Sequence, residues 1–376
     1  MNDNAYHRRL ERLLAPADVA LDGLRPWDLQ VRRPELFRRL FAEGSLGLGE
    51  SYMDGWWDCE RLDELFARML AARLDRRVRS WRQVLPYLAA RLSNRQSRRR
   101  AFRIGRHHYD IGNDLYRRML DERMIYSCGY WREAETLDAA QEAKLDLVCR
   151  KLGLEPGMRV LDVGCGWGGA ARFAAERYGV SAVGITVSEE QARLARDATG
   201  DLPVEIRLED YRSLTPERDG TFDRIFSLGM FEHVGVKNYR TFFRVVRSLL
   251  AGDGLFLLHT IGGNRSVRGT EAWIDRYIFP GSMLPSARQI TAAAEGLWVL
   301  EDWHGFGADY ARTLMAWHER FEDAWEELAA SYDERFHRMW RYYLLSCAGS
   351  FRARRNQLWQ VVFSPRGVPG GYIAPR

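Results

Sequence analysis

The sequence predicts an α/β protein with a doubly wound, Rossmann-like sheet and a small, mainly helical N-terminal domain. Two observations predict this fold. Short β-rich runs alternate with helical segments from residue 107 onward, which is typical of a parallel sheet with helices on both faces. A hydrophobic strand also runs directly into a glycine turn and a helix at VLDVGCGWGG, residues 160–169. With 376 residues, the chain is long enough to bury the cores of two domains.

Residues 1–90 form the first predicted domain. The spacing of apolar residues predicts a short amphipathic helix over 35–41 and another over 61–74. Between them, the stretch GSLGLGESYMDGWW, residues 44–57, contains three glycines before Glu50 and predicts a loop with tight turns. Residues 91–106, RLSNRQSRRRAFRIGR, are polar and strongly basic, so they predict a solvated linker to the second domain.

The second predicted domain, residues 107–376, carries the alternating pattern. Its expected strands are 160–163, 181–185, 204–208, 224–227 and 255–259, separated by helices such as 137–152, 169–178 and 189–198. Two further β-like segments, 298–303 and 358–363, flank a long helical region over 311–355. We expect the final strand, reached after so long an excursion, to return antiparallel at the edge of the sheet.

Charge and cysteine usage narrow the class of protein. The basic charge comes almost wholly from arginine. The stretch from Arg73 to Arg106 contains twelve arginines and a single acidic residue, Asp75. Nucleic acid and an anionic membrane both fit such a stretch. The N-terminus lacks the apolar core of a signal peptide, and no run approaches the roughly 18 apolar residues of a membrane span. The five scattered cysteines form no CxxC pair, which predicts neither a disulfide framework nor a metal site.

The glycine turn after the first strand predicts a nucleotide-like ligand, because glycines let the backbone approach it closely. A dinucleotide fold expects an acid at the end of the second strand, but this strand ends in Thr186. Asp162 precedes the first glycine, and LEDY follows the third strand, where Asp210 and Tyr211 would hold the edge and face of an adenine. These features favour S-adenosylmethionine over a nicotinamide or flavin. They also favour the seven-stranded class I methyltransferase sheet.

At these residues the sequence closely resembles the cyclopropane fatty acid synthases, which are related to the mycolic acid cyclopropane synthases. The matching blocks, in the family's order, are GSLGLGESYMDGWW, HYDIGNDLYRRMLDERMIYSCGYW, VLDVGCGWGG, GITVSEEQ, FEHVG, LLHTIG, GADYARTL and FRARRNQLWQVVFS. Eight blocks in one order are far more specific than any single motif. The first lies in the N-terminal domain, so the resemblance is to the two-domain bacterial phospholipid enzymes.

The resemblance implies a set of residues that contact the cofactor. They are Tyr126, Ser127, Gly164, Gly166, Thr186, Gln191, Asp210 and Tyr211. A structural alternative stays open for Thr186 and Gln191, because such residues often only cap a helix, here one that starts near Ser188.

The resemblance also implies a bicarbonate ion as the base that removes a proton from the transferred methyl group. The corresponding ligands are Cys128, Glu232, His259, Ile261 through its backbone amide, and Tyr310. Cys347 matches a family cysteine and is kept as a further catalytic candidate, although a thiolate nucleophile suits a carbocation poorly. Other roles remain open for three of these residues. Cys128 would be an inert buried thiol and Tyr310 a core aromatic residue, and Glu232 would itself be the base.

Family membership would make the substrate an unsaturated phospholipid at the membrane surface. We then expect a cytoplasmic homodimer, bound peripherally through its basic stretch to the anionic inner face of the cell membrane, with no nucleic-acid partner. Residues 1–90 would serve lipid binding and dimerisation. Two other functions stay open: methylation of RNA or a small molecule, and lipid binding without catalysis. Some relatives add a methyl branch instead of closing a ring, and the sequence separates these outcomes poorly.

Overall fold

The computed structural model describes residues 3–76 and 112–376, which form two compact units. The first unit takes in the described residues of Met1–Ser93 together with Gly269–Pro280 and Tyr310–Asn356. The second contains the described residues of Asn94–Arg268 with Gly281–Asp309 and Gln357–Arg376. The predicted basic linker, 91–106, lies outside the described residues.

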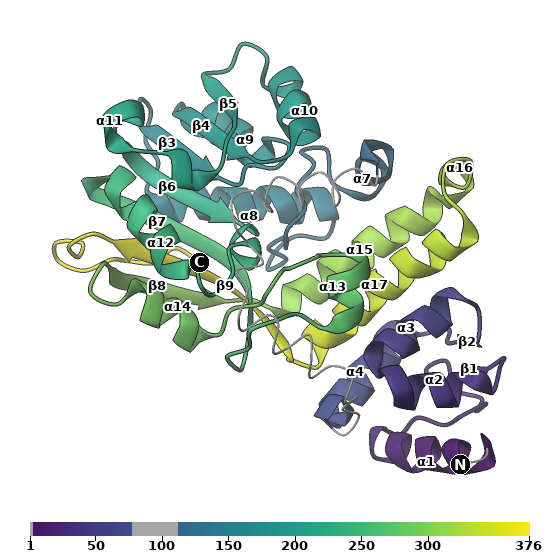
Figure 1. The fold of residues 1–376 in the computed structure, drawn as a ribbon. Coiled ribbons are helices and arrows are strands. Elements are labelled where there is room, and N and C mark those ends of the chain that lie inside the picture. The colour runs from purple at the N-terminus through teal and green to yellow at the C-terminus, as the bar shows by residue number, and fades with distance from the viewer. Residues whose placement is uncertain (1–2, 77–111) are drawn as a thin grey trace. The chain divides into compact units, whose positions relative to one another are not determined.

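The first unit is mainly helical (Figure 1). Its helices are α1 (Asp3–Leu14), α2 (Glu35–Glu43), α3 (Ser45–Met53), α4 (Leu62–Ala71), α13 (Ala272–Tyr277), most of α15 (Ala308–Asp323), α16 (Trp325–Leu328) and α17 (Glu334–Arg352). A two-residue strand pair, β1 (Gln30–Val31) and β2 (Trp57–Asp58), completes it. The helices predicted at 35–41 and 61–74 are confirmed as α2 and α4.

Aromatic side chains from distant parts of the sequence form the core of this unit. The ring of Tyr342 on α17 lies 5.5 Å from that of Tyr52 and 4.6 Å from that of Trp273. Arg338, one turn earlier on α17, donates to the backbone oxygens of Tyr52 and Trp57 at 2.6 and 2.9 Å. The late helix α17 is therefore part of the same core as the N-terminal helices.

The loop predicted over residues 44–57 is wrong, because Ser45–Met53 forms helix α3. Only the flanking glycines, Gly44 and Gly55, have positive φ angles, of 64° and 69°. The glycines inside the helix allow close packing instead. A Cβ on Gly47 would lie 2.6 Å from the backbone oxygen of Arg39, and one on Gly49 would lie 2.4 Å from Trp273. Tertiary packing thus overrides the low helix propensity of glycine.

Gly49→Ala is expected to destabilise the protein by about 1–3 kcal/mol, because the added methyl group collides with the rigid Trp273 ring. Chemical denaturation of the full chain measures this effect. Gly269→Ala is the matched control, since a Cβ there meets no atom within 4 Å among the described residues. Equal stability of the two variants would contradict the packing role of Gly49.

The second unit contains the sheet. Within the described residues it has seven strands: β3 (Arg159–Val163), β4 (Ser181–Thr186), β5 (Val204–Leu208), β6 (Phe222–Leu228), β7 (Leu250–Gly263), β8 (Val299–Gly305) and β9 (Asn356–Ser364). Their order is β5-β4-β3-β6-β7-β9-β8, and the first five pair in parallel. The predicted doubly wound, seven-stranded methyltransferase sheet is confirmed.

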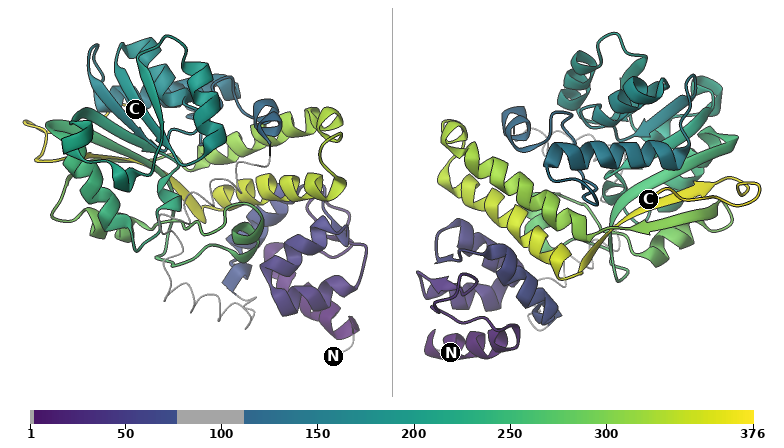
Figure 2. Two further views of the ribbon diagram at one scale, coloured as in Figure 1. Left: turned by 45° about the horizontal axis from the view of Figure 1, so that its top comes forward. Right: turned by 180° about the vertical axis from the view of Figure 1, so that it is seen from behind.

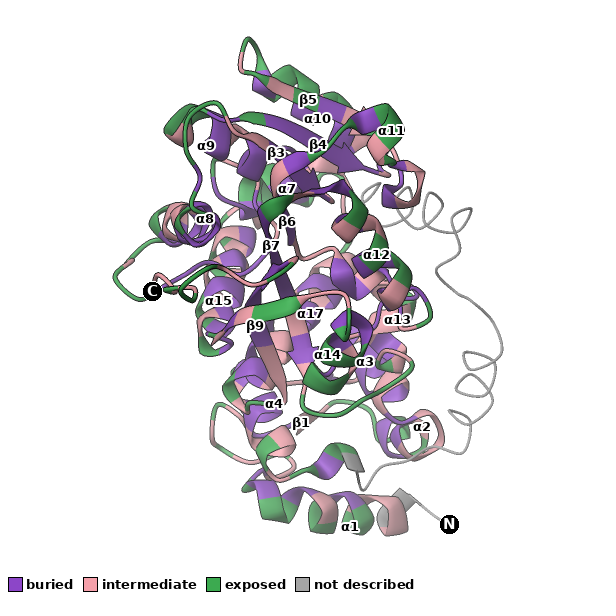
Figure 3. Ribbon diagram, turned by 90° about the vertical axis from the view of Figure 1, so that its left-hand side faces the viewer, coloured by how far each residue is buried: buried purple, intermediate pink, exposed green. Residues whose placement is uncertain are grey.

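Helices cover both faces of this sheet, as Figures 1 and 2 show. On one face, Leu161 and Val163 pack in a cluster with residues of α12 (Tyr239–Leu249) and α14 (Ala287–Ala294). On the other, Val160 packs with residues of α8 (Leu137–Leu152) and α9 (Gly169–Tyr178). Because successive side chains of a strand alternate between faces, most of β3 and β4 is buried (Figure 3).

The last strand does not lie at the sheet edge as predicted. β9 is inserted between β7 and β8 and is antiparallel to β8, which forms the edge. Burial explains the order, because seven of the nine β9 residues are buried, whereas Val299 and Leu300 of β8 are each 42% exposed. An apolar strand gains more from a central place than a mixed one.

In the part of the chain that the structure describes, no helix combines the length and the apolar character needed to cross a membrane.

Candidate active site

The glycine loop follows β3 at the carboxyl end of the sheet. Gly164, Gly166 and Gly168 have φ angles of 92°, 55° and 80°, and α9 begins at the next residue. A Cβ on Gly164 would lie 2.6 Å from Met230, so the loop has no room for a side chain there. A Cβ on Gly166 would meet only Nε2 of Gln191 within 4 Å, at 3.9 Å, among the described residues. The backbone at Gly166 therefore has free space beside it, next to the Gln191 side chain.

Thr186 and Gln191 form a buried polar pair where β4 leads into α10 (Glu189–Thr199). The Thr186 hydroxyl donates to Oε1 of Gln191 at 2.9 Å. The side chain that caps α10 is Ser188, whose hydroxyl accepts from the Gln191 amide at 3.3 Å. The Thr186 hydroxyl accepts from the Ser188 backbone amide at 3.2 Å, so Thr186 supports the capping residue, and the predicted contact of Thr186 and Gln191 with a cofactor stays a prediction.

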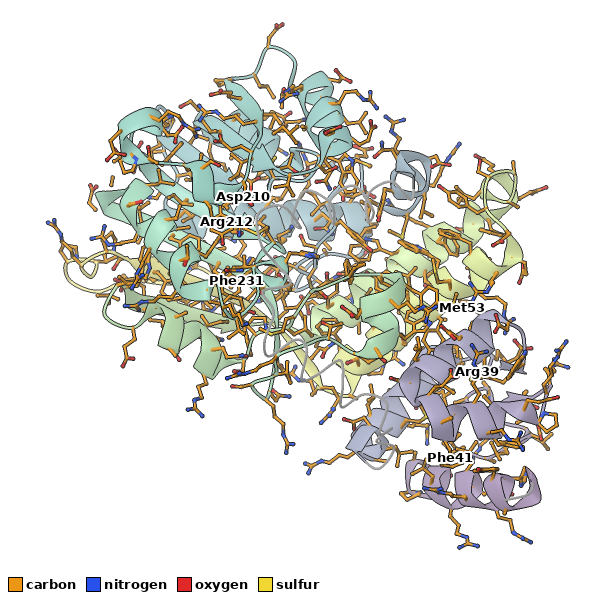
Figure 4. All side chains as sticks on the ribbon, in the orientation of Figure 1. Arg39, Phe41, Met53, Asp210, Arg212 and Phe231 are labelled. Atoms are coloured by element: carbon orange, nitrogen blue, oxygen red, sulfur yellow. The ribbon has the colours of Figure 1, made fainter. Side chains whose placement is uncertain are left out.

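Asp210 and Tyr211 follow β5. The Asp210 carboxylate pairs with Arg212, with distances of 2.7 Å from Nε and 2.6 Å from Nη2 (Figure 4). It also accepts from the Arg212 amide, which caps a short 3₁₀ turn. The Tyr211 ring packs edge-on against Phe242, and burial raises the pKa of Tyr211 to about 12. Both residues thus have structural partners beside their predicted role in holding adenine.

The segment 126–130 runs along helix α8. Gln141 donates to the backbone oxygen of Ser127 at 2.8 Å, and the Lys144 ammonium donates to the Ser127 hydroxyl at 2.9 Å. The buried Cys128 thiol contacts the oxygen of Gly129 at 3.1 Å. Tyr126 packs edge-on against Tyr116, with ring centroids 5.2 Å apart. Ser127 is therefore held by two side chains of α8.

Glu232 is a buried carboxyl group at the carboxyl end of β6, in the short 3₁₀ turn Phe231–His233. Its Oε1 accepts from the backbone amide of Ile261 at 2.6 Å. Its Oε2 is buried and has no hydrogen-bond partner within residues 3–76 and 112–376. Burial raises the pKa of Glu232 to about 7, and the Ile261 amide, the Glu232 backbone amide and the nearby Thr260 hydroxyl oppose this shift only in part. Glu232 can therefore exchange a proton near neutral pH.

His259 lies on β7, two residues before Ile261, and is 1% exposed. Burial, and then the positive charges of Lys144 and Lys151, hold the pKa of His259 well below its ordinary value, so the ring is neutral. Nε2 of Gln360 lies 3.4 Å from Nδ1. With Gln360 as donor, the ring proton lies on Nε2, for which the described residues offer no partner.

Oε2 of Glu232 and Nε2 of His259 are thus two buried polar atoms without a hydrogen-bond partner among the described residues, and the Ile261 amide that holds Glu232 lies two residues beyond His259 on β7. Such atoms cost free energy in a folded protein and mark sites that serve a ligand or a reaction. A carboxyl oxygen and an imidazole N–H are suitable partners for a small oxyanion. The Ile261 amide, which the resemblance assigns to that anion, donates to Glu232 in the structure.

The two remaining catalytic candidates belong to the first unit. Tyr310 stacks on Phe351 with ring centroids 4.5 Å apart and lies edge-on to Trp317. Cys347 on α17 is half-buried, and burial, with a further contribution from Glu271, raises its pKa to about 12. Its thiol is therefore protonated at neutral pH, which disfavours a role as a nucleophile.

Sequence reasoning singled out Asp162 and His259 but missed three buried polar residues beside them, Gln141, Lys144 and Gln360. Asp162, His259 and Gln360 share the sheet face that α8 covers, by the alternation of β3, β7 and β9, and α8 supplies Gln141 and Lys144. Burial raises the pKa of Asp162 to about 8 and lowers that of Lys144 to about 8. One signal was available. The chain has only three lysines, and two of them, Lys144 and Lys151, lie seven residues apart on one helix face and are fully buried.

Comparison with known proteins agrees with this geometry. Residues 96–361 match the family model for mycolic acid cyclopropane synthetase. The chain is 54% identical over 375 residues to the cyclopropane-fatty-acyl-phospholipid synthase of Escherichia coli K12, and the match covers 100% of this chain and 97% of that protein. The cyclopropane synthase MmaA2 from Mycobacterium tuberculosis has 33% identity and a TM-score of 0.65, over 70% of this chain and 97% of that one.

A third similar protein is the mycolic acid cyclopropane synthase CmaA1, whose structure contains S-adenosylhomocysteine (SAH) and CTAB. It has 34% identity and a TM-score of 0.64, over 70% of this chain and 97% of that one. The residues here fit such a ligand, because the glycine loop, which is open at Gly166, lies at the same edge of the sheet as the ends of β4 and β5. The chain therefore belongs to the mycolic acid cyclopropane synthetase family and is an S-adenosylmethionine-dependent methyltransferase.

Proposed function

We propose that this enzyme transfers a methylene group from S-adenosylmethionine to the double bond of unsaturated phospholipid acyl chains and so forms a cyclopropane ring. The observation that supports this most is the buried Glu232 carboxyl group. One of its oxygens is held by Ile261, and the other has no hydrogen-bond partner among the described residues. The full-length match to the E. coli cyclopropane-fatty-acyl-phospholipid synthase supports the choice of lipid.

The reaction needs two bond-forming steps. S-adenosylmethionine supplies an electrophilic methyl group when it is bound. The alkene electron pair forms the first C–C bond as the C–S bond breaks, which leaves a positive charge on the second acyl carbon. A C–H bond of the new methyl group then breaks, and its electron pair forms the second C–C bond. The site must therefore accept one proton without offering a strong nucleophile to the cation.

Bicarbonate fits this requirement as a weakly nucleophilic base. We propose Glu232, His259, Cys128, Ile261 and Tyr310 as the residues that would hold it. Support comes from Glu232 Oε2 and the Nε2 of neutral His259, which are an acceptor and a donor without a described partner. With a pKa of about 7, Glu232 can take up the proton that leaves the site. The alternative is that Glu232 removes the methyl proton directly.

The remaining parts of the proposal concern location. We infer a peripheral, cytoplasmic homodimer on the anionic inner face of the cell membrane, in which residues 1–90 serve lipid binding and dimerisation. Support comes from the arginine-rich stretch Arg73–Arg106, most of which lies outside the described residues. Arginines at an anionic bilayer contribute roughly 1 kcal/mol each to binding, and salt screens this attraction. No nucleic-acid partner is expected.

Incubation of the enzyme with labelled S-adenosylmethionine and vesicles of unsaturated phospholipid tests the proposed function. Mass analysis should show acyl chains that have gained one CH2 and lost the double bond. Conversion should be faster on anionic than on neutral vesicles at low salt, and the difference should shrink as salt is raised. Unchanged acyl chains with SAH binding intact would refute the proposal.

A further inference from the structure

The fully buried Lys144 is a charged group that the reaction described above does not use. It lies on α8, and its ammonium donates to the Ser127 hydroxyl at 2.9 Å. Burying an ammonium group is costly unless nearby groups compensate for lost water. A fold that needed only stability would place an apolar residue on this helix face. The presence of a lysine there requires a reason.

Three contacts from one face of α8 hold the neighbouring segment 126–130. The oxygen of Ala140 accepts from the Tyr130 amide at 2.8 Å, Gln141 holds the Ser127 backbone oxygen, and Lys144 holds the Ser127 hydroxyl. Residues three and four apart face the same side of a helix, so the three contacts act together. Of these, only the Lys144 contact reaches a side chain.

Titratable groups from four separate parts of the chain surround Lys144. They are Asp121 after α7 (Asn113–Met119), Cys128, Asp162 on β3 and His259 on β7, all of which interact electrostatically with Lys144. Neither oxygen of Asp162 has a hydrogen-bond partner in the described parts of the chain. The ammonium is therefore the positive charge that faces the carboxyl group just before the glycine loop. Lys144 connects that loop electrostatically with the segment that carries Ser127 and Cys128.

We propose that Lys144 is a positioning residue, whose ammonium holds the Ser127 hydroxyl and the segment 126–128 in the conformation that binds S-adenosylmethionine. This inference rests on the proposed cofactor contacts of Tyr126 and Ser127. Lys144 touches neither the lipid nor the reacting carbon in this account. Its effect therefore falls on cofactor affinity and not on the bond-forming steps.

The chain offers a matched control in Lys151. It lies two turns further along α8, is equally buried, and contacts Asp302 and His304 at 3.3 and 3.1 Å. Burial lowers the pKa of both lysines to about 8. Replacing either lysine by methionine removes the same charge from the same helix. A purely structural role for Lys144 would make the two variants behave alike.

The test is SAH binding to the full chain, measured by calorimetry, with thermal unfolding recorded alongside. Lys144→Met should weaken SAH binding about tenfold to a hundredfold, as expected for loss of a charged hydrogen bond, whereas Lys151→Met should change it less than about threefold. The KM for S-adenosylmethionine should rise by the same factor as the SAH dissociation constant. In a Ser127→Ala background, Lys144→Met should have little further effect, because the contact is already lost.

Equal SAH affinities of Lys144→Met and Lys151→Met, or full additivity with Ser127→Ala, would overturn the inference. If Lys144→Met does not fold, Lys144→Gln and Lys151→Gln are compared in its place, because Ser127→Ala also removes a proposed cofactor contact. Equal SAH affinities of these two variants would likewise overturn the inference. SAH binding requires no lipid. A failure to form cyclopropane rings would therefore refute the proposed function without affecting the result of this binding test.

Discussion

Glu232→Gln is expected to lower turnover by about a hundredfold to ten-thousandfold while SAH affinity barely changes. The substitution keeps the shape and the acceptor for the Ile261 amide but removes the group that takes up a proton. The wild-type rate should rise as pH increases through about 7, where Glu232 loses its own proton, and then reach a plateau. Glu301→Gln is the matched control, because Glu301 also accepts a backbone amide, from Val368 at 2.9 Å.

Bicarbonate distinguishes the two versions of this proton transfer. If the ion is the base, depleting dissolved carbonate should slow the wild type, and added bicarbonate should restore part of the activity of Glu232→Gln by refilling a weakened site. If neither enzyme responds to the ion, with SAH binding confirmed, Glu232 itself becomes the base. Turnover in carbonate-free buffer, with and without added bicarbonate, measures this difference.

Stability gives an independent check on the burial of Glu232. The pKa of this carboxyl group is raised in the folded state, so the wild type loses stability as pH rises from about 4.5 to about 7. The loss amounts to about 3 kcal/mol. The free energy of unfolding of Glu232→Gln minus that of the wild type should therefore be larger at pH 8 than at pH 5. A constant stability difference across this range would contradict the raised pKa.

Gly164→Ala is expected to have the second largest effect, with SAH affinity reduced at least about tenfold and stability reduced by about 1–3 kcal/mol. The residue has a φ of 92°, and an added Cβ would lie 2.6 Å from Met230. The collision displaces either the glycine loop or the start of the turn that carries Glu232. Calorimetric titration with SAH and denaturant unfolding measure the two effects.

Gly200→Ala controls for backbone strain alone. Gly200 also has a positive φ, of 50°, but a Cβ there meets nothing within 4 Å among the described residues. This variant should lose some stability and keep its affinity for SAH. Equal losses of affinity at the two positions would show that the loop geometry around Gly164 is not what binds the cofactor.

The sheet could be predicted from the sequence because its information is local. Parallel β/α units are indicated by the alternation of apolar strands and helices. They are also indicated by the strand that leads into the glycine loop VGCGWGG. Two predictions failed where the deciding contacts are distant in sequence. The glycines of α3 are explained by Trp273, more than two hundred residues away, and the central place of β9 is explained by burial against β7.

Part of the candidate site could be predicted from local motifs, whereas the part that depends on contacts distant in sequence could not. Glu232 follows β6, and His259 and Ile261 lie near the carboxyl end of β7, where family motifs are strong. The structure places the Glu232 carboxyl group on the Ile261 amide. Lys144 carries no motif and lies within an ordinary helical pattern. Its importance depends on burial and on Asp162, neither of which can be read from spacing.

The most direct test of the central claim uses S-adenosylmethionine whose methyl group carries three deuterons, incubated with the enzyme and unsaturated phospholipid vesicles. Ring closure removes one hydrogen of the transferred methyl group and keeps the other two. The account therefore predicts saturated acyl chains that contain a ring CD2 group and no CD3 group. Acyl chains that retain all three deuterons in a methyl branch would show that no proton leaves the methyl group, and would contradict the proposed role of the Glu232 site.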